Sequence, residues 1–329
     1  ALINADPKEI IFTSGATEAN NLAILGSARA LAEGGGGPTL LFGSRAEHPS
    51  VLGPLRILQQ EGFPLTLLPL KEGALVDLEG LDGADPESFV SLQWANNETG
   101  CVQDLKQAKR RARDSILHCD AVQGWGKLDP SAALEVADLF TLSGHKVGAL
   151  KGIGVLRVRE TVPVSPILSG GGHQGGLRPG TESPALAAAL AEALGLAEKE
   201  RSLWEESGKE ALKHLFRALL EGFPESVIHR PDPEGASLPN TASVGFPGVD
   251  GRALLPACEK VGLALSAGSA CSTGAPTPST VLLASGVGED LARASLRISF
   301  PPGSGGEVGE EAGKRLAMVA NRAYEVAKR

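Results

Sequence analysis

The sequence is poor in the features of nucleic-acid-binding and membrane-spanning proteins. Its 39 acidic residues outnumber 31 basic ones, which gives a net charge of -8, and Lys and Arg form no block. This balance gives no support to binding of nucleic acid or of an anionic membrane surface. No apolar run approaches the length of a transmembrane span, and the start does not resemble a signal peptide. The sequence therefore predicts neither a nucleic-acid nor a membrane partner.

Cysteine is also scarce, with four among 329 residues. Cys101, Cys119, Cys258 and Cys271 lie far apart, without the spacing of a metal site. Reduced thiols in a cytoplasmic protein are the simplest interpretation. Buried, structural roles are the expectation for the first three.

Methionine is scarcer still. Met318 is the only one, and the chain begins with Ala1 just before a predicted strand. We therefore expect that a leading segment of the protein is missing from this sequence.

Short apolar runs alternate with helical patterns through the first half of the chain, which predicts an α/β fold with a mostly parallel sheet between helices. The length suits a large domain followed by a smaller one, and the boundary is placed near residue 200, giving domains 1–200 and 201–329. Strands are predicted over residues 9–13, 39–43, 65–70, 88–94, 115–119, 138–143 and 153–158, and helices over 16–32, 49–61 and 104–114.

The second half opens with a strong helix start, because Ser183 can cap the helix and Pro184 suits its first turn. The pattern continues to about residue 221, with a break expected near Gly195 or Gly208. Further strands are predicted over residues 242–246 and 295–300. The final helix is predicted to bury one stripe, made of Val308, Ala312, Leu316, Val319, Ala323 and Val326.

Three polar segments each follow a predicted strand, where parallel sheets bind ligands. The first, residues 14–21, has small residues at a strand-to-helix junction and suits a phosphate as well as an ordinary turn. The second places Asp120 at a strand end, where a carboxylate can keep a pyridine nitrogen protonated or simply cap a helix. The third places Ser143, His145 and Lys146 after another strand, where Lys146 can react with an aldehyde. A surface lysine is the ordinary alternative, but the three segments occurring in this order favour a pyridoxal-phosphate (PLP) site.

At this point the chain resembles the fold-type I PLP enzymes and, among them, the NifS-type cysteine desulfurases. The resemblance runs from about Asp6 to Phe300 with its motifs in the same order. They are residues 11–21, the Glu47-His48 segment, the loop 96–100, the Gly-rich stretch 170–181 and the loop 266–271.

The resemblance implies a fold of PLP-dependent transferase type I and a set of site residues. Lys146 should hold the cofactor covalently, and Cys271 in the small domain should be the nucleophile. Asp120 should pair with the ring nitrogen, Gln123 with the ring oxygen, and His48 should stack on the ring. The other cofactor contacts implied are Ala16, Thr17, Asn97, Ser143, Gly144, His145 and, from a second subunit, Thr181. Asn97 and Arg297 should hold the substrate carboxylate.

The activity implied is conversion of L-cysteine to L-alanine, with the sulfur left as a persulfide on Cys271. The partners implied are a second copy of the chain and a sulfur acceptor, such as an iron–sulfur scaffold. The segment after Cys271 is small, polar and turn-rich, which suits a moving nucleophile.

The chain departs from the family pattern in two loops. It lacks the usual Gly-Pro before Lys151 and the usual Glu-Arg pair after Gln174, and Pro179 replaces a common Ser. A selenocysteine lyase, another PLP lyase and an inactive truncated relative are the alternatives. A nicotinamide-dependent dehydrogenase is disfavoured, because the glycines at 170–172 open no strand–helix unit with a downstream acid.

Overall fold

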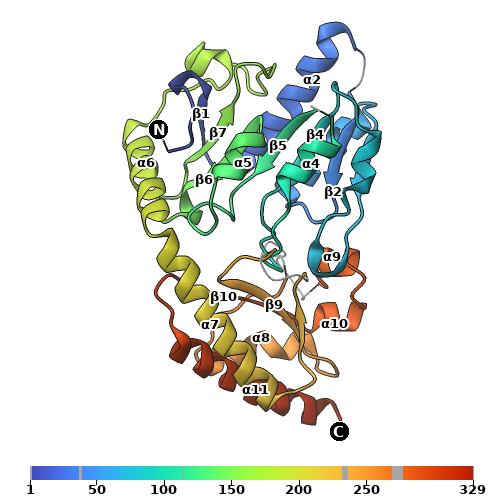
Figure 1. Ribbon diagram of the computed structural model, residues 1–329, viewed down its shortest axis with the longest axis vertical. Coiled ribbons are helices and arrows are strands. Elements are labelled where there is room, and N and C mark those ends of the chain that lie inside the picture. The colour runs from blue at the N-terminus through green and yellow to red at the C-terminus, as the bar shows by residue number, and fades with distance from the viewer. Residues whose placement is uncertain (1, 37–38, 114, 232–235, 269–276, 329) are drawn as a thin grey trace. The chain divides into compact units, whose positions relative to one another are not determined.

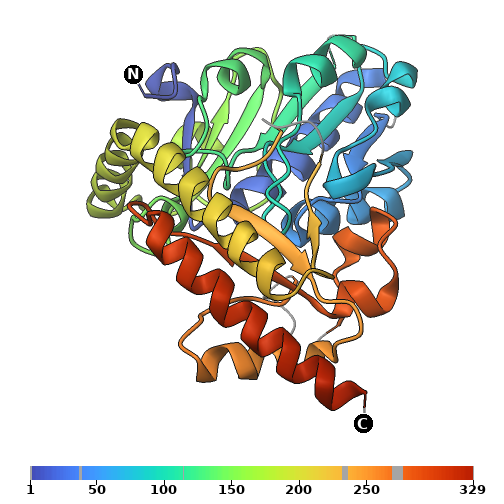
Figure 2. The ribbon, with the colours of Figure 1, turned by 60° about the horizontal axis from the view of Figure 1, so that its bottom comes forward.

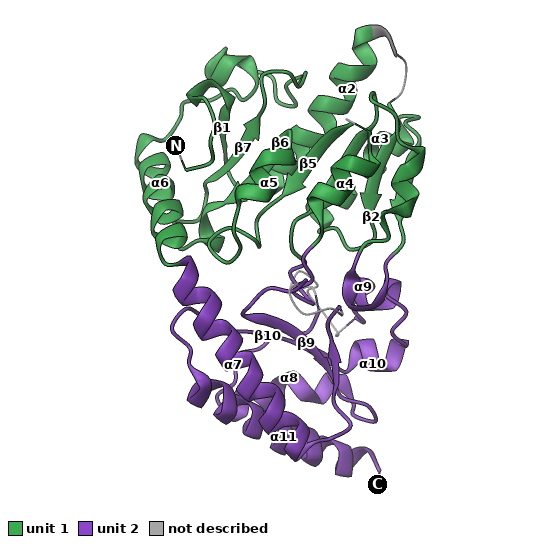
Figure 3. Ribbon diagram, in the orientation of Figure 1, with its two compact units in different colours: residues 1–69, 76–95, 103–200 green, residues 70–75, 96–102, 201–329 purple. Residues whose placement is uncertain are grey.

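The fold is described from a computed structural model, which places residues 2–36, 39–113, 115–231, 236–268 and 277–328 (Figure 1). Two compact units are distinguished in it (Figure 3). Unit 1 consists of residues 1–69, 76–95 and 103–200, and unit 2 of residues 70–75, 96–102 and 201–329. Two short segments that sequence reasoning placed in the first domain, 70–75 and 96–102, thus belong to unit 2.

Unit 1 contains a seven-stranded sheet with the strand order β1-β7-β6-β5-β4-β2-β3. The strands from β6 to β3 run parallel to their neighbours, whereas β7 is antiparallel to both β6 and β1. The predicted α/β fold with a mostly parallel sheet is therefore confirmed. The strands are β1 (Ile10–Thr13), β2 (Leu41–Ser44), β3 (Leu65–Leu68), β4 (Phe89–Gln93), β5 (Ile116–Asp120), β6 (Leu139–Ser143) and β7 (Gly154–Val158).

Helices cover this sheet because their apolar stripes need a partner surface. One core cluster packs the helical residues 19–28 and 51–58 against the strands. Phe89 and Leu139 are among its strand residues. A second pair of helices, α4 (Leu105–Arg111) and α5 (Ser131–Val136), pack against each other and lie in front of the sheet in Figure 1. The other helices of unit 1 are α1 (Ala16–Asn21), which continues through a π-helical turn into α2 (Ser27–Leu31), α3 (Pro49–Gln60) and α6 (Pro184–Lys199).

The sheet register brings two distant turns to one edge, those after β1 and β6. Thr13 at the end of β1 pairs with Gly154, and Gly154 pairs with Ser143 at the end of β6. A β-carbon on Gly154 would lie 2.6 Å from the backbone of Gly15, so only glycine allows the turn before α1 to pack here. The turns after β1 and β6 therefore meet at the carboxyl edge of the sheet, where ligands are expected.

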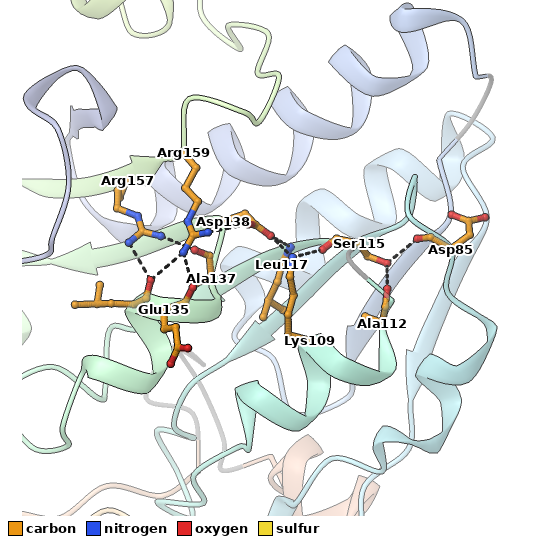
Figure 4. Close-up of polar contacts among 11 residues, drawn as sticks. Asp85, Lys109, Ala112, Ser115, Leu117, Glu135, Ala137, Asp138, Arg157 and Arg159 are labelled. Atoms are coloured by element: carbon orange, nitrogen blue, oxygen red, sulfur yellow. Dashed lines mark hydrogen bonds and ion pairs between the residues drawn. The ribbon is translucent and has the colours of Figure 1, made fainter.

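Charged groups lie at the opposite edge of this sheet, where the strands β5 and β6 begin (Figure 4). Lys109 Nζ lies 2.6 Å from Asp138 Oδ2 and 2.7 Å from the Ser115 carbonyl oxygen, and the Leu117 amide donates to the same carboxylate at 2.9 Å. The guanidinium groups of Arg157 and Arg159 donate to backbone carbonyls at the end of α5. These contacts fasten α4 and α5 to the starts of β5 and β6.

Unit 2 is built on a small antiparallel sheet of order β10-β9-β8 and two long helices, α7 (Arg201–Gly222) and α11 (Gly306–Ala327). These helices run side by side (Figures 1 and 2). A β-carbon on Gly309 would lie 2.0 Å from the Ala211 carbonyl oxygen, so glycine is needed for this close approach. The strands are β8 (Val227–His229), β9 (Thr241–Gly245) and β10 (Ser295–Ser299), and the shorter helices are α8 (Gly251–Lys260), α9 (Thr280–Ala284) and α10 (Glu289–Arg293).

Two sequence expectations about helices were wrong. The long helical stretch breaks after Lys199, and both suggested glycines lie inside helices. Gly208 is needed inside α7, because a β-carbon there would lie 2.8 Å from the Asn240 side chain. In α11 the predicted stripe is also displaced, since Val308 is 52% exposed and Val326 72% exposed. The face that packs on α7 is lined by small residues, which hydrophobicity alone does not mark. Within the described residues, no helix has the length and apolarity to cross a bilayer.

Candidate active site

The turn after β1 is shaped for an anion. Thr13 Oγ1 donates to the Gly15 carbonyl at 2.9 Å, and the Ser14 amide donates at 2.7 Å to Glu18 Oε2 from the first turn of α1. Thr17 lies exposed in the first turn of this helix. Amide groups in a first helical turn have no partner within the helix and favour a negative ligand. Ala16 and Thr17 are therefore placed where the sequence predicts phosphate contacts.

The segment after β6 faces the same edge. Ser143 Oγ lies 3.0 Å from His145 Nδ1, and Gly144 to Lys146 form a single 3-10 turn. Burial, with smaller contributions from Lys146 and Lys151, lowers the pKa of His145. His145 and Lys146 both have exposed side chains at this edge.

Asp120 is the last residue of β5 and is 7% exposed. Its carboxylate accepts from Asn20 Nδ2 at 2.8 Å and from the Val122 amide at 3.1 Å. Burial raises the pKa of Asp120, opposed by these hydrogen bonds and by His48. These two donors are neutral, so the carboxylate is suited to a further, positively charged partner. Gln123 lies in the following turn, where its side-chain oxygen is 3.3 Å from Lys127 Nζ.

His48 is the N-cap of α3 and is linked to Asp120 by hydrogen bonds. Its Nδ1 accepts from the Ser50 amide at 3.1 Å and lies 2.8 Å from Ser50 Oγ. Ser50 Oγ is in turn 2.9 Å from Asn20 Nδ2. Burial lowers the pKa of His48; the Asp120 charge raises it and the Lys146 charge lowers it, by less. The structure thus joins the two residues predicted to contact the cofactor ring.

Glu47 is a second buried carboxyl in this region. Its Oε1 accepts from the Gln93 amide at 3.0 Å and from Ser44 Oγ at 2.9 Å, and Gln93 is paired with Asp120 in the sheet. Burial, with a smaller contribution from the nearby Asp120 charge, raises the pKa of Glu47 to about 8. Glu47 is therefore neutral at pH 7, next to a carboxylate.

The Gly-rich stretch is tied to the first turn of α1. Arg178 Nε lies 2.8 Å from Glu18 Oε1, and the Gln174 side chain bonds the Phe12 amide at 2.6 Å and its carbonyl at 2.9 Å. Gln174 has a φ of 50°, which is strained for a residue with a side chain. Thr181 is exposed at the end of this stretch, and its contact with a second subunit stays a prediction.

Unit 2 holds the residues predicted to bind the substrate carboxylate. Arg297 on β10 donates from Nη1 to the Asn97 carbonyl at 3.1 Å. Asn96 shapes the turn that contains Asn97, because the Asn96 Oδ1 accepts from the Glu98 and Thr99 amides at 2.8 and 2.9 Å. Asn97 and Arg297, 200 residues apart in sequence, are therefore brought together within unit 2.

The predicted nucleophile, Cys271, lies outside the described residues. The chain before it is fixed at Ser266, whose amide and carbonyl both bond the Arg297 backbone. The chain after it is fixed at Ser279, whose hydroxyl donates to the buried Glu98 carboxylate. Both flanks are thus held by the loop and strand that carry Asn97 and Arg297. Cys101, Cys119 and Cys258 are buried, as expected.

Comparison with known proteins identifies the family. Residues 1–302 match the family Aminotransferase class-V. The cysteine desulfurase IscS of Neisseria meningitidis is 41% identical over 306 residues, which cover 91% of this chain and 74% of that protein. The chain belongs to the class-V aminotransferases, within their cysteine desulfurase group. PLP is the cofactor of this family, and cysteine desulfuration is the activity of this group.

Other class-V aminotransferases support the same placement. The cysteine desulfurase IscS of Escherichia coli is 39% identical over 307 residues, 91% of this chain and 74% of that protein. A solved NifS-like protein superposes with a TM-score of 0.84 at 28% identity, covering 98% of this chain and 85% of that one. DndA from Streptomyces lividans gives a TM-score of 0.79 at 35% identity, covering 92% and 85%. The predicted fold type I is therefore confirmed.

The residues of unit 1 fit PLP, the cofactor of the class-V aminotransferases. Gly154 makes room for the turn that would receive the phosphate. The buried Asp120 has neutral donors and complements a protonated ring nitrogen. Among the described residues no cluster of His, Cys, Asp and Glu is arranged to hold a metal. Ala16, Thr17, Ser143, Gly144 and His145 would hold the phosphate, and Asp120, Gln123 and His48 the ring.

Sequence reasoning missed the polar residues that support these contacts. Asn20, Ser50, Glu98 and Ser279 are all buried or capping residues that bond a predicted site residue or the chain beside it. Asn20 and Glu98 lie within the motifs at 11–21 and 96–100, and Ser50 follows His48, so position in a motif was the signal that could have found these three.

Proposed function

We propose that this chain removes sulfur from L-cysteine with Lys146 holding PLP and Cys271 taking the sulfur. The observation that carries the proposal is the convergence on one sheet edge of the turn at Gly15, Ser143 and the buried Asp120. Residues 1–200 would supply the cofactor site, and residues 201–329 the Cys271 loop and Arg297.

The proposed roles follow from the chemistry of each group. Arg297 and Asn97 hold the substrate carboxylate, which fixes the α-carbon. PLP, when bound, draws electrons from that carbon. Lys146 takes the α-proton and later returns one. The Cys271 thiolate attacks the substrate sulfur, so an S–S bond forms as the carbon–sulfur bond breaks and its electron pair goes to carbon. Protonation of that fragment gives alanine, and the persulfide stays on Cys271.

The finer biological setting is also proposed. A homodimer follows from the match at Arg178 and Thr181, whose threonine would complete the phosphate site of a second subunit. An acceptor protein, such as an iron–sulfur scaffold, would receive the persulfide sulfur. A cytoplasmic setting suits the buried Cys101, Cys119 and Cys258, which form no disulfide among the described residues.

Two measurements test the proposal. Borohydride reduction followed by peptide mass mapping should place the cofactor on Lys146; an adduct on Lys151 would contradict the assignment. Cys271→Ala should keep the cofactor's colour and lose alanine and persulfide formation by orders of magnitude. If Cys271→Ala still made alanine and sulfide at the wild-type rate, a lyase reaction, as in selenocysteine lyases, would replace desulfuration. Absence of colour after addition of PLP would indicate an inactive relative.

A further inference from the structure

Asn20 occupies an unusual position for an amide. It lies in α1, faces the sheet and is 0% exposed. Its Nδ2 is 2.8 Å from Asp120 Oδ2 and 2.9 Å from Ser50 Oγ. A carboxylate oxygen only accepts hydrogen bonds, so the nitrogen of the amide, not its oxygen, must face Asp120. Both amide hydrogens are thereby used, one toward Asp120 and one toward Ser50.

This orientation sets the direction of the next two hydrogen bonds. Since Ser50 Oγ accepts from Asn20, its own hydrogen is left to donate to His48 Nδ1 at 2.8 Å. The Ser50 backbone amide donates to the same Nδ1 at 3.1 Å. A ring nitrogen that faces two donors carries no proton, and a neutral imidazole then has its proton on Nε2.

We propose that Asn20 and Ser50 form a hydrogen-bond relay that holds His48 as the neutral imidazole with its proton on Nε2, and that Asn20 is a positioning residue for His48 and Asp120 together. The inference rests on the proposed function, in which these two residues contact the cofactor ring. Its consequence is that His48 offers one defined donor, Nε2–H, and that Nδ1 takes no part in moving protons. Of the charged groups, Asp120 and Lys146 act on His48.

One atom of the relay is unfavourably placed for stability, which argues that Asn20 serves the site. Asn20 Oδ1 is buried and accepts no hydrogen bond within the described chain. A buried polar atom without a partner is unfavourable, and an apolar residue at this position of α1 would avoid it.

The chain contains a matched control. Ser91 Oγ lies 2.8 Å from His118 Nδ1, the same pair of atoms at the same distance as in Ser50 and His48. His118 is fully buried in the sheet, and its Nε2 bonds Thr141 Oγ1 at 3.0 Å, so the hydrogen bonds of this pair lead to Thr141 and not to Asn20. Ser91→Ala therefore removes an equivalent bond outside the relay.

The test is nitrogen NMR of the holoenzyme labelled with ¹⁵N-histidine at neutral pH, with His48 assigned by His48→Gln. We expect His48 to show a protonated Nε2 and an unprotonated Nδ1. Ser50→Ala should raise the pKa of His48 and bring in a fraction of the Nδ1-protonated form, whereas Ser91→Ala should leave the His48 signals unchanged. A charged or Nδ1-protonated His48 in the wild type, or equal effects of the two variants, would overturn the relay.

A second variant tests the other end of the relay. Asn20→Ala should raise the dissociation constant for PLP about tenfold, the order expected when a charged group loses one hydrogen bond, and should shift the His48 signals as Ser50→Ala does. An unchanged dissociation constant would show that Asn20 does not support Asp120. The two proposals fail separately: alanine formation with an Nδ1-protonated His48 would refute only the relay, and an Nε2-protonated His48 without alanine formation would refute only the desulfurase function.

Discussion

The two edges of the unit 1 sheet treat buried charge in opposite ways. At the edge in Figure 4, Asp138 meets Lys109 at 2.6 Å, and Arg159 lies 3.8 Å from its other oxygen. At the carboxyl edge, the Asp120 carboxylate accepts from the amides of Asn20 and Val122, and Glu47 is a neutral, buried carboxyl.

At the first edge the charges are paired within the chain, whereas the second edge is suited to a charged ligand. A buried charge with an opposite partner is neutralised within the chain, whereas a buried carboxylate held by neutral donors gains most from an added cation. A protonated pyridine nitrogen would supply that cation at Asp120. Substitutions at the first edge should therefore change stability, and substitution of Asp120 at the second should change function.

The largest effect is expected at Asp120. Asp120→Asn keeps the shape and the Asn20 contact but removes the charge opposite the ring nitrogen, so the rate of alanine formation should fall roughly 10²–10³-fold. Thermal stability should hold or rise, because burial already raises the pKa of this carboxyl. Wild-type activity in Asp120→Asn, measured on the PLP-loaded protein, would remove the distinction between the edges.

The next effect concerns Glu47 and pH. Burial raises its folded pKa from 4.5 to about 8. Between these values the unfolded state has lost a proton that the folded state keeps, so the free energy of unfolding falls as pH rises from 4.5 to about 8 and is level above. Glu47→Gln stays neutral and avoids this loss, of at most roughly 5 kcal/mol. The free energy of unfolding of Glu47→Gln, relative to wild type, should therefore be higher at pH 8.5 than at pH 5. These two pH values span most of the range between the two pKa values of Glu47.

Urea unfolding at the two pH values measures this, with Glu79→Gln as a control for an exposed carboxyl. A difference between Glu47→Gln and wild type that is the same at both pH values would show that Glu47 is ionised in the folded protein.

A smaller effect is expected at Asp138. Asp138→Asn leaves Lys109 Nζ without its carboxylate in a half-buried position, which should lower the free energy of unfolding by about 1–3 kcal/mol. Alanine formation per folded molecule should not change. Combining it with Lys109→Met should cost less than the sum of the two single changes, because the pair is then removed together. A loss of activity in Asp138→Asn without a loss of stability would show that this edge supports function and not the stability of the fold.

The smallest effect is expected at Arg159, whose side chain is 37% exposed. Arg159→Lys should change the free energy of unfolding by less than about 1 kcal/mol, because solvent screens the remaining ion pair. Arg157→Lys should cost more, since Arg157 is buried and its fork holds the carbonyls at the end of α5. Equal losses in a thermal melt would show that burial does not set the difference.

Local pattern was enough to find most strands of unit 1 and the site residues that follow them. Alternating apolar runs located β1, β5 and β6, and polar residues directly after them indicated Asp120 and Lys146. The same method failed in α11, because Gly309 and Gly313 pack there by close backbone approach, which a count of large apolar residues cannot detect.

The sequence by itself determined the α/β class, the order of the motifs and the residue types at the strand ends, because strand periodicity and turn chemistry are local properties. Only the tertiary structure decided which polar groups meet. Asn20 reaches Ser50 across 30 residues and Asp120 across 100, and Arg297 reaches Asn97 across 200. These pairings depend on strand order and register, which arise from burying the whole core, and no single segment of the chain encodes them.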